Sequence, residues 1–150
     1  MAGGEFALAA ADYDEAVKLG AGAAATNLFQ RYLLARRLNE EDAANDFRRA
    51  VRKWKPKWET SIGCFLADQL TERELLTAAT DANPLVQKQR LCQTFFYVGM
   101  VKLLAGEHTE AALSFERCLA TENRTLFEYR IARAELARIA ADRVKTLGAW

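Results

Sequence analysis

The sequence has little of the material from which enzyme and metal sites are built. Its 150 residues include one histidine, His108, and three cysteines, Cys64, Cys92 and Cys118, with no CxxC pair. This count indicates neither a zinc site nor a disulfide framework, although it leaves room for one disulfide. Gly-rich phosphate loops and GxSxG motifs are also absent. We therefore expect no enzyme activity, no cofactor and no metal, with His108 as a solvated turn residue and an enzyme centred on it as the weakest hypothesis.

Helix breakers and long apolar runs are scarce as well. Two prolines and eight glycines favour long helices. No apolar run approaches the ~18 residues that span a membrane, and the N-terminus lacks the basic-then-apolar order of a signal peptide.

A net charge of +1 argues against a general attraction to nucleic acid. The compartment stays open: periplasmic or organellar if a leader has been removed, and cytoplasmic otherwise.

A spacing of small and aromatic residues recurs along the chain. Its copies are Ala9, Tyr13 and Ala16; Ala43, Phe47 and Ala50, 34 residues later; and Ala111, Phe115 and Cys118, twice 34 residues further on. Small residues around an aromatic ring on one helix face allow a second helix to approach closely. The period is that of the tetratricopeptide repeat. The copy expected at Thr77, Asp81 and Pro84 is absent, which predicts a degenerate repeat with a short second helix.

The clearest unit runs from Cys92 to Leu119 and reads as two antiparallel helices joined by a turn at Gly106. Gly99 on its first helix is expected to let the second helix approach. Four helix starts are signalled elsewhere: Asn39 as a cap, Thr71 with Glu74 and Thr125 with Glu128 as capping boxes, and Asn83 before Pro84.

These signals predict an all-α fold, a tetratricopeptide-like α-α superhelix of about seven to eight helices in antiparallel pairs. We expect a single domain over 1–150. Its parts are a disordered or turn segment at 1–5, an orphan helix at 6–22, degenerate repeats at 24–80, the best repeat at 84–121 and a terminal helix at 126–147. The orphan helix leaves an apolar face uncovered, which indicates truncation, processing or a partner.

The stretch LCQTFFYVGMVKLLAGEHTEAALSFERCLA, followed by LFEYRIARAEL, resembles the C-terminal repeats of the NlpI-type bacterial lipoproteins. The resemblance extends over roughly Asn27 to Ala140. Members of that family are non-catalytic tetratricopeptide scaffolds, and the best understood is an outer-membrane lipoprotein that brings a periplasmic protease to peptidoglycan hydrolases. The resemblance therefore implies a scaffold. This sequence departs from the family in having no lipobox cysteine near its start.

The repeat register places a set of first-helix residues on the concave side of such a stack. They are Leu28, Tyr32, Arg36, Ile62, Leu66, Phe96 and Met100. Aromatic and Met side chains there can form a groove for a partner helix or an extended peptide. They can equally be core contacts with the shortened middle repeat, and the sequence leaves both interpretations open.

The run RRAVRKWKPKW gathers cations around Trp54 and Trp58. The basic residues are Arg48, Arg49, Arg52, Lys53, Lys55 and Lys57. They can neutralise a single strand or a phosphorylated partner while the tryptophans stack on it. The interpretation we favour is a helix end whose cations complement the helix dipole and whose tryptophans pack between repeats.

The expected function is a non-catalytic protein–protein interaction scaffold, acting as an adaptor or as an accessory subunit of a larger complex. Its partner is expected to be a protein or peptide. Binding of nucleic acid or a phosphorylated partner through Arg48 to Lys57 is the alternative, with nucleic acid the less favoured. A homo-oligomer formed through the uncovered N-terminal helix is a further expectation.

Overall fold

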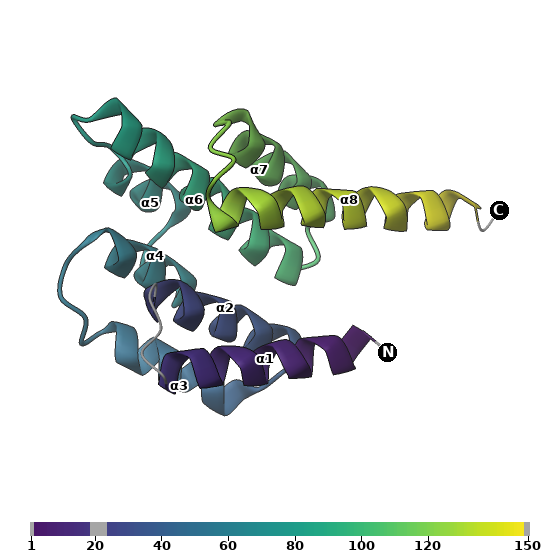
Figure 1. Cartoon of the computed structure of the whole chain (residues 1–150), viewed down its shortest axis with the longest axis horizontal. Helices are drawn as coiled ribbons and strands as arrows, with labels where there is room; N and C mark the ends of the chain where they lie inside the picture. Colours follow the sequence, from purple (N-terminus) through teal and green to yellow (C-terminus); the bar gives the residue numbers. More distant parts are fainter. Residues whose placement is uncertain (1, 19–23, 149–150) are drawn as a thin grey trace. The chain divides into compact units, whose positions relative to one another are not determined.

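The computed structural model describes residues 2–18 and 24–148, with side chains over 4–15 and 25–148. These residues form eight α-helices and no strand (Figure 1). The prediction of an all-α protein with about seven to eight helices is confirmed for this part of the chain. The helices belong to two compact units, Met1–Leu70 and Thr71–Trp150, which we call unit 1 and unit 2.

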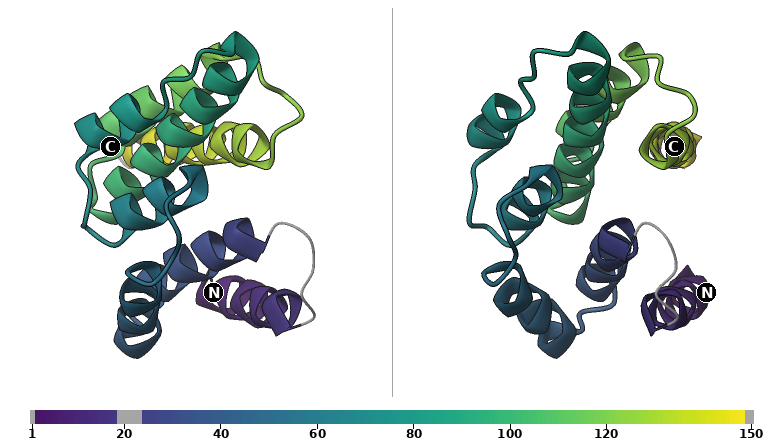
Figure 2. Two further views of the ribbon diagram at one scale, coloured as in Figure 1. Left: turned by 90° about the vertical axis from the view of Figure 1, so that its left-hand side faces the viewer. Right: turned by 60° about the vertical axis from the view of Figure 1, so that its left-hand side comes forward.

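Unit 1 consists of α1 (Ala2–Lys18), α2 (Ala24–Arg37), α3 (Glu41–Val51) and α4 (Trp58–Leu66). Helix α1 lies along α2, α2 packs on α3, and α4 contacts both α2 and α3 (Figure 2). Aromatic rings form the centre of this unit. Phe47 stacks on Tyr32 with 4.4 Å between ring centroids, and Phe29 lies 6.3 Å from Phe47 and 6.1 Å from the ring of Trp54.

Two boundaries in unit 1 differ from the sequence prediction. Helix α1 begins at Ala2, within the segment 1–5 expected to be turn or disorder, and Glu5 in its first turn suits the positive end of the helix dipole. Asn39 does not cap α3. It has a φ of 57°, and the following amide of Glu40 donates to the Ala35 carbonyl. Asn39 therefore ends α2 in the left-handed conformation that asparagine tolerates. The end of the orphan helix predicted at 6–22 and the side chain of Ala16 lie outside the described residues.

Unit 2 consists of α5 (Glu72–Ala78), α6 (Pro84–Leu104), α7 (His108–Ala120) and α8 (Phe127–Gly148). Helices α6 and α7 form an antiparallel hairpin, and α8 packs on both (Figure 2). The hairpin turns at Gly106, whose φ is +81°, as the sequence predicts. A Cβ atom on Gly99 would lie 2.5 Å from Cε1 of Phe115, so the absence of a side chain there permits the close approach of the two helices.

Helix starts in unit 2 follow the predicted signals in two of three cases. The hydroxyl of Thr71 accepts from the Glu74 amide, and α5 is short, with seven residues, at the place where the repeat pattern fails. The Asn83 side chain accepts from the Leu85 amide ahead of α6. Glu128, by contrast, does not serve a capping box at α8. Its carboxylate is buried and accepts from Tyr97 and Gln93 on α6, because burial favours the partners that α6 provides.

Candidate functional site

The seven residues expected to line a groove are divided between the units, and most are buried. Five belong to unit 1 and two, Phe96 and Met100, to unit 2. Five have at most 4% of their surface exposed, namely Tyr32, Ile62, Leu66, Phe96 and Met100. The ring of Tyr32 stacks on Phe47 in unit 1, and that of Phe96 lies 4.9 Å from Tyr97 in unit 2. These rings contribute to the cores of their own units, while Leu28 and Arg36 are half-buried.

Unit 1 contains two adjoining cavities that share Leu28 and Trp54 and together form a trough, which we call the Leu28–Trp54 trough. The first has a volume of about 310 Å³, and the second about 380 Å³. The first is lined by Asp14, Leu28, Arg31, Tyr32, Ala35, Ala43, Asp46, Phe47, Ala50 and Trp54. The second is lined by Ala25, Leu28, Trp54, Lys55, Lys57 and Glu59.

Small side chains on α3 explain why there is a cavity at this place. Ala43 and Ala50 lie one turn either side of Phe47 on α3, so small side chains flank a buried ring and leave space beside it. Trp54 follows α3 in a turn and is held against Phe47, with ring centroids 6.0 Å apart. The Trp54 ring also packs against Gly63 of α4, because a Cβ atom added to Gly63 would lie only 2.9 Å from Cζ3 of Trp54. The floor of the trough is therefore backed by the aromatic core of unit 1.

The charged side chains that line the first cavity form ion pairs within unit 1. The Arg31 guanidinium donates to Asp14 on α1 at 3.0 Å and to Glu40 at 2.6 Å. Burial opposes the charge of Arg31, but the hydrogen bonds to Glu40 and Asp14 outweigh it and raise the pKa of the guanidinium. Asp46 pairs with Arg49 at 2.7 Å. The carboxylates of this cavity are thus already matched by cations of the same unit.

The second cavity has a different electrostatic character, because it is edged by Lys55 and Lys57. Both lysines are exposed on the segment between α3 and α4, and Glu59 is the acid beside them. With two cations and one anion, this cavity favours a ligand that brings a negative group next to an apolar one.

The six cations of the predicted basic patch differ in exposure and in their partners, so they do not form one continuous exposed surface. Arg48 is half-buried, donates to Asn45 at 2.9 Å and lies over the ring of Tyr32. Arg49 pairs with Asp46. The four that follow α3 are exposed, namely Arg52, Lys53, Lys55 and Lys57.

Three residues considered for other chemistry belong to unit 2, whereas the trough is in unit 1. His108 is exposed at the first turn of α7. Cys92 and Cys118 are buried and face each other across α6 and α7, with their Sγ atoms 3.5 Å apart. Their hydrogen bond lowers the pKa of Cys92 and, together with burial, raises that of Cys118, as expected where Cys118 keeps the proton. Among the described residues, no cluster of three or more histidine, cysteine or acidic side chains can hold a metal ion.

Sequence reasoning found parts of the trough but did not join them. Leu28 was expected in a groove, and Lys55 and Lys57 in a basic patch, while Trp54 was expected to pack between helices. Leu28 and Trp54 join the two cavities, since both residues line both of them. The signal that pointed to this place was the pair Ala43 and Ala50 around Phe47, which marks room on the surface of α3.

No helix in the described part of the chain is both long enough and apolar enough to cross a membrane. Searches with protein-family models, with curated proteins and with solved structures found nothing that matches the chain. The structure shows an all-α fold over the described residues and no family, and the tetratricopeptide superhelix and the resemblance to NlpI-type lipoproteins remain expectations from the sequence.

Proposed function

We propose that this chain is a non-catalytic, tetratricopeptide-like scaffold that binds a segment of a partner protein in the Leu28–Trp54 trough, as an adaptor or accessory subunit. The observation that carries the proposal is the pair of adjoining cavities with an apolar floor and a basic edge. The spacing of helices supports the repeat interpretation, because α4 begins at Trp58, 34 residues after α2 begins at Ala24.

The chemistry of the trough defines the ligand class. Leu28, Trp54 and the rings behind them favour an aliphatic or aromatic anchor residue, and cavities of this size hold a few side chains rather than a folded domain. Lys55 and Lys57 favour an acidic residue beside the anchor. The expected ligand is a short peptide segment with an apolar anchor followed or preceded by Asp or Glu.

Nucleic-acid or phospho-partner binding through the basic segment is the second candidate. Four exposed cations after α3 favour it. Against it, Trp54 packs on Phe29 and Phe47, which leaves its ring less free to stack on a base. Binding of this kind would weaken steeply with salt and would depend on Arg52 and Lys53 as strongly as on Lys55 and Lys57.

Selection from a random peptide display library on immobilised protein tests the proposal. We expect the wild-type chain to enrich peptides with an apolar anchor next to an acidic residue. The variant Lys55→Glu/Lys57→Glu is expected to lose these peptides or to prefer basic ones, with at least about a tenfold loss of affinity for a selected peptide.

Arg52→Glu/Lys53→Glu is the matched control, since it changes the net charge equally on exposed neighbours that do not line the trough. It is expected to keep the selected peptides. Enrichment of no common motif, or an equal loss in the control, would refute the trough as the binding site. Equal losses together with salt-sensitive oligonucleotide binding would favour the second candidate.

A further inference from the structure

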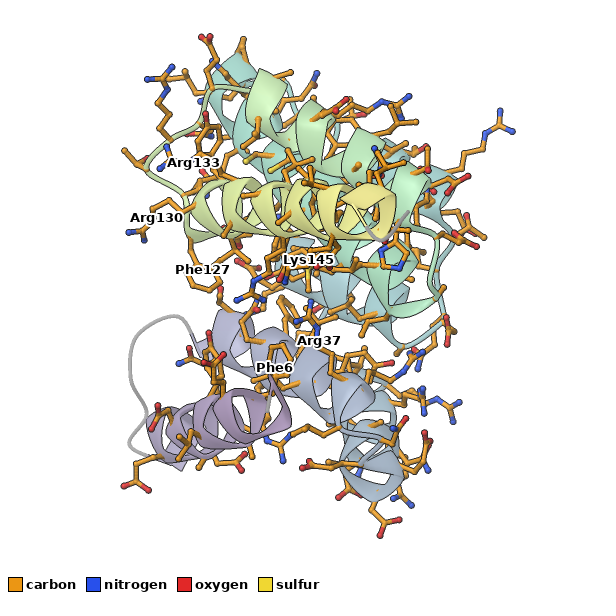
Figure 3. All side chains as sticks on the ribbon, turned by 90° about the vertical axis from the view of Figure 1, so that its right-hand side faces the viewer. Phe6, Arg37, Phe127, Arg130, Arg133 and Lys145 are labelled. Carbon is orange, nitrogen blue, oxygen red and sulfur yellow. The ribbon has the colours of Figure 1, made fainter. Side chains whose placement is uncertain are left out.

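Helix α1 presents an exposed face that is acidic. It packs on α2 through one side, where Ala10 is buried and Phe6 lies against the Arg37 guanidinium (Figure 3). The other side is exposed and carries three acids, Glu5, Asp12 and Glu15. No lysine or arginine occurs between positions 4 and 15, and the fourth acid, Asp14, is paired with Arg31 of α2. Leu8, which is 71% exposed, provides an apolar centre for this face.

Helix α8 presents an exposed face of the opposite sign. It packs on α6 and α7 through a side on which Glu128, Ala132, Glu135 and Ile139 are buried. Its other residues are mostly exposed and include five cations and one acid: Arg130, Arg133, Arg138, Arg143, Lys145 and Asp142. Figure 3 labels Arg130, Arg133 and Lys145 among them. Between the charges lie small and apolar side chains, namely Ala134, Ala137, Ala141 and Val144.

The last turns of α8 bury none of their residues, although Arg143 donates to the Thr109 hydroxyl of α7 at 3.3 Å. Every residue from 140 to 148 is exposed, and Figure 1 shows this end of the helix extending past α6 and α7. Val144 and Leu147 are 68% and 73% exposed. A helix end that buries no side is marginal in water, because helices gain most of their stability from packing. An occupant that covers α8 would stabilise these turns.

We propose that the occupant is α1 of a second copy of this chain, so that the acidic face of α1 on one copy packs on the basic face of α8 on another. The opposite charges of the two faces carry the proposal, and the apolar residues between the charges give each face a centre that can be buried. The lengths also agree, with 17 residues in α1 and 22 in α8. This contact is independent of the Leu28–Trp54 trough as a peptide site.

Such a contact is heterologous, since it joins two different surfaces. Once two copies have joined, one still has a free α8 face and the other a free α1 face, so association continues beyond the dimer unless the ring closes. One helix-on-helix contact is small for a protein interface, which predicts weak association that depends on concentration and salt.

Two charge-reversed variants test the proposal by light scattering after size exclusion. Asp12→Arg/Glu15→Arg destroys the α1 face, and Arg130→Glu/Arg133→Glu destroys the α8 face. All four positions are exposed, so folding is expected to be retained. The wild-type mass is expected to rise with concentration above 16.8 kDa and each variant alone to stay monomeric. An equimolar mixture is expected to stop at a two-chain species, because one intact α1 face and one intact α8 face remain.

The control is Arg73→Glu/Arg124→Glu, which changes net charge as the α8 variant does, at exposed positions elsewhere in unit 2. It is expected to associate like the wild type. A monomeric wild type at every concentration overturns the proposal, and so does a variant that still associates alone, since that indicates a symmetric contact through the unchanged face. If a charge variant melts at a lower temperature than the wild type, Leu8→Ser replaces the α1 variant and Val144→Ser replaces the α8 variant. A mixture of these two variants that does not form a two-chain species also overturns the proposal.

Discussion

At the scale of single residues, the close approach of Gly99 to Phe115 constrains how α6 and α7 pack. Phe115 is fully buried, and its ring centroid lies 6.3 Å from that of Phe96, so surrounding side chains restrict movement of the Phe115 ring. A side chain at position 99 would meet three atoms of the Phe115 ring at 2.5 to 3.1 Å. Close-packed interiors respond to one added methyl group by shifting side chains or backbone.

We expect Gly99→Ala to lower the free energy of unfolding by about 1–2 kcal/mol, because overpacking outweighs the gain of about 1 kcal/mol in helix propensity. Urea unfolding followed by circular dichroism measures this. Gly4→Ala in α1 is the control, since a Cβ there meets nothing within 4 Å. The smaller side chain of Phe115→Leu should reduce the cost of Gly99→Ala in a double-mutant cycle. An alanine at position 99 that leaves stability unchanged or higher would contradict the close approach.

At the scale of helices, boundaries depend on a few side chains that satisfy free backbone groups. The start of α6 is the clearest case, since Asn83 accepts from the Leu85 amide at 3.0 Å and Pro84 occupies a position where an amide hydrogen has no helical partner. Asn39 at the end of α2 satisfies backbone groups in a different way, by adopting a left-handed conformation that lets the Glu40 amide donate to the Ala35 carbonyl. Asparagine suits both a cap and a left-handed residue, so its identity alone does not say which helix it serves.

Asn83→Ala is expected to destabilise the protein by about 1 kcal/mol, because the Leu85 amide loses its acceptor at the start of α6. Asn83→Gly should cost only a few tenths of a kcal/mol, since glycine is itself tolerated as a cap. Thermal or urea unfolding of both variants separates the two effects. Equal losses for alanine and glycine would show that the Asn83 side chain does something other than cap α6.

At the scale of the whole molecule, the chain consists of two compact units, and unit 2 has a core of its own. Phe96, Tyr97 and Phe115 are all fully buried, and the ring of Phe96 lies 4.9 Å from that of Tyr97 and 6.3 Å from that of Phe115. We expect a fragment of residues 71–150 to fold into a helical structure that unfolds cooperatively. Circular dichroism with a urea titration measures this. A fragment with no cooperative transition would show that unit 2 requires unit 1 for its stability.

The candidate site shows where sequence reasoning was sufficient and where it was not. The α2–α3 pair forms around Phe47, but Ala43 and Ala50, which were expected to let a helix approach closely, line an open cavity beside it. The first-helix positions at Tyr32 and Phe96 were expected to belong to either a groove or a core, and their burial places them in the cores of two different units. Helix periodicity identifies an apolar face but does not distinguish a side covered by the protein from one left open.

The sequence by itself determined the helical class, the turn at Gly106, the short helix at the failed repeat and the caps at Thr71 and Asn83. These features depend on neighbouring residues, whose backbone preferences and hydrogen bonds act over a few positions. Only the tertiary structure decided that Cys92 faces Cys118, that Glu128 turns to Tyr97, and that Leu28, Trp54 and two lysines edge one trough. Each of these is a meeting of residues distant in sequence, and such meetings are set by how helices pack against one another and not by local propensity.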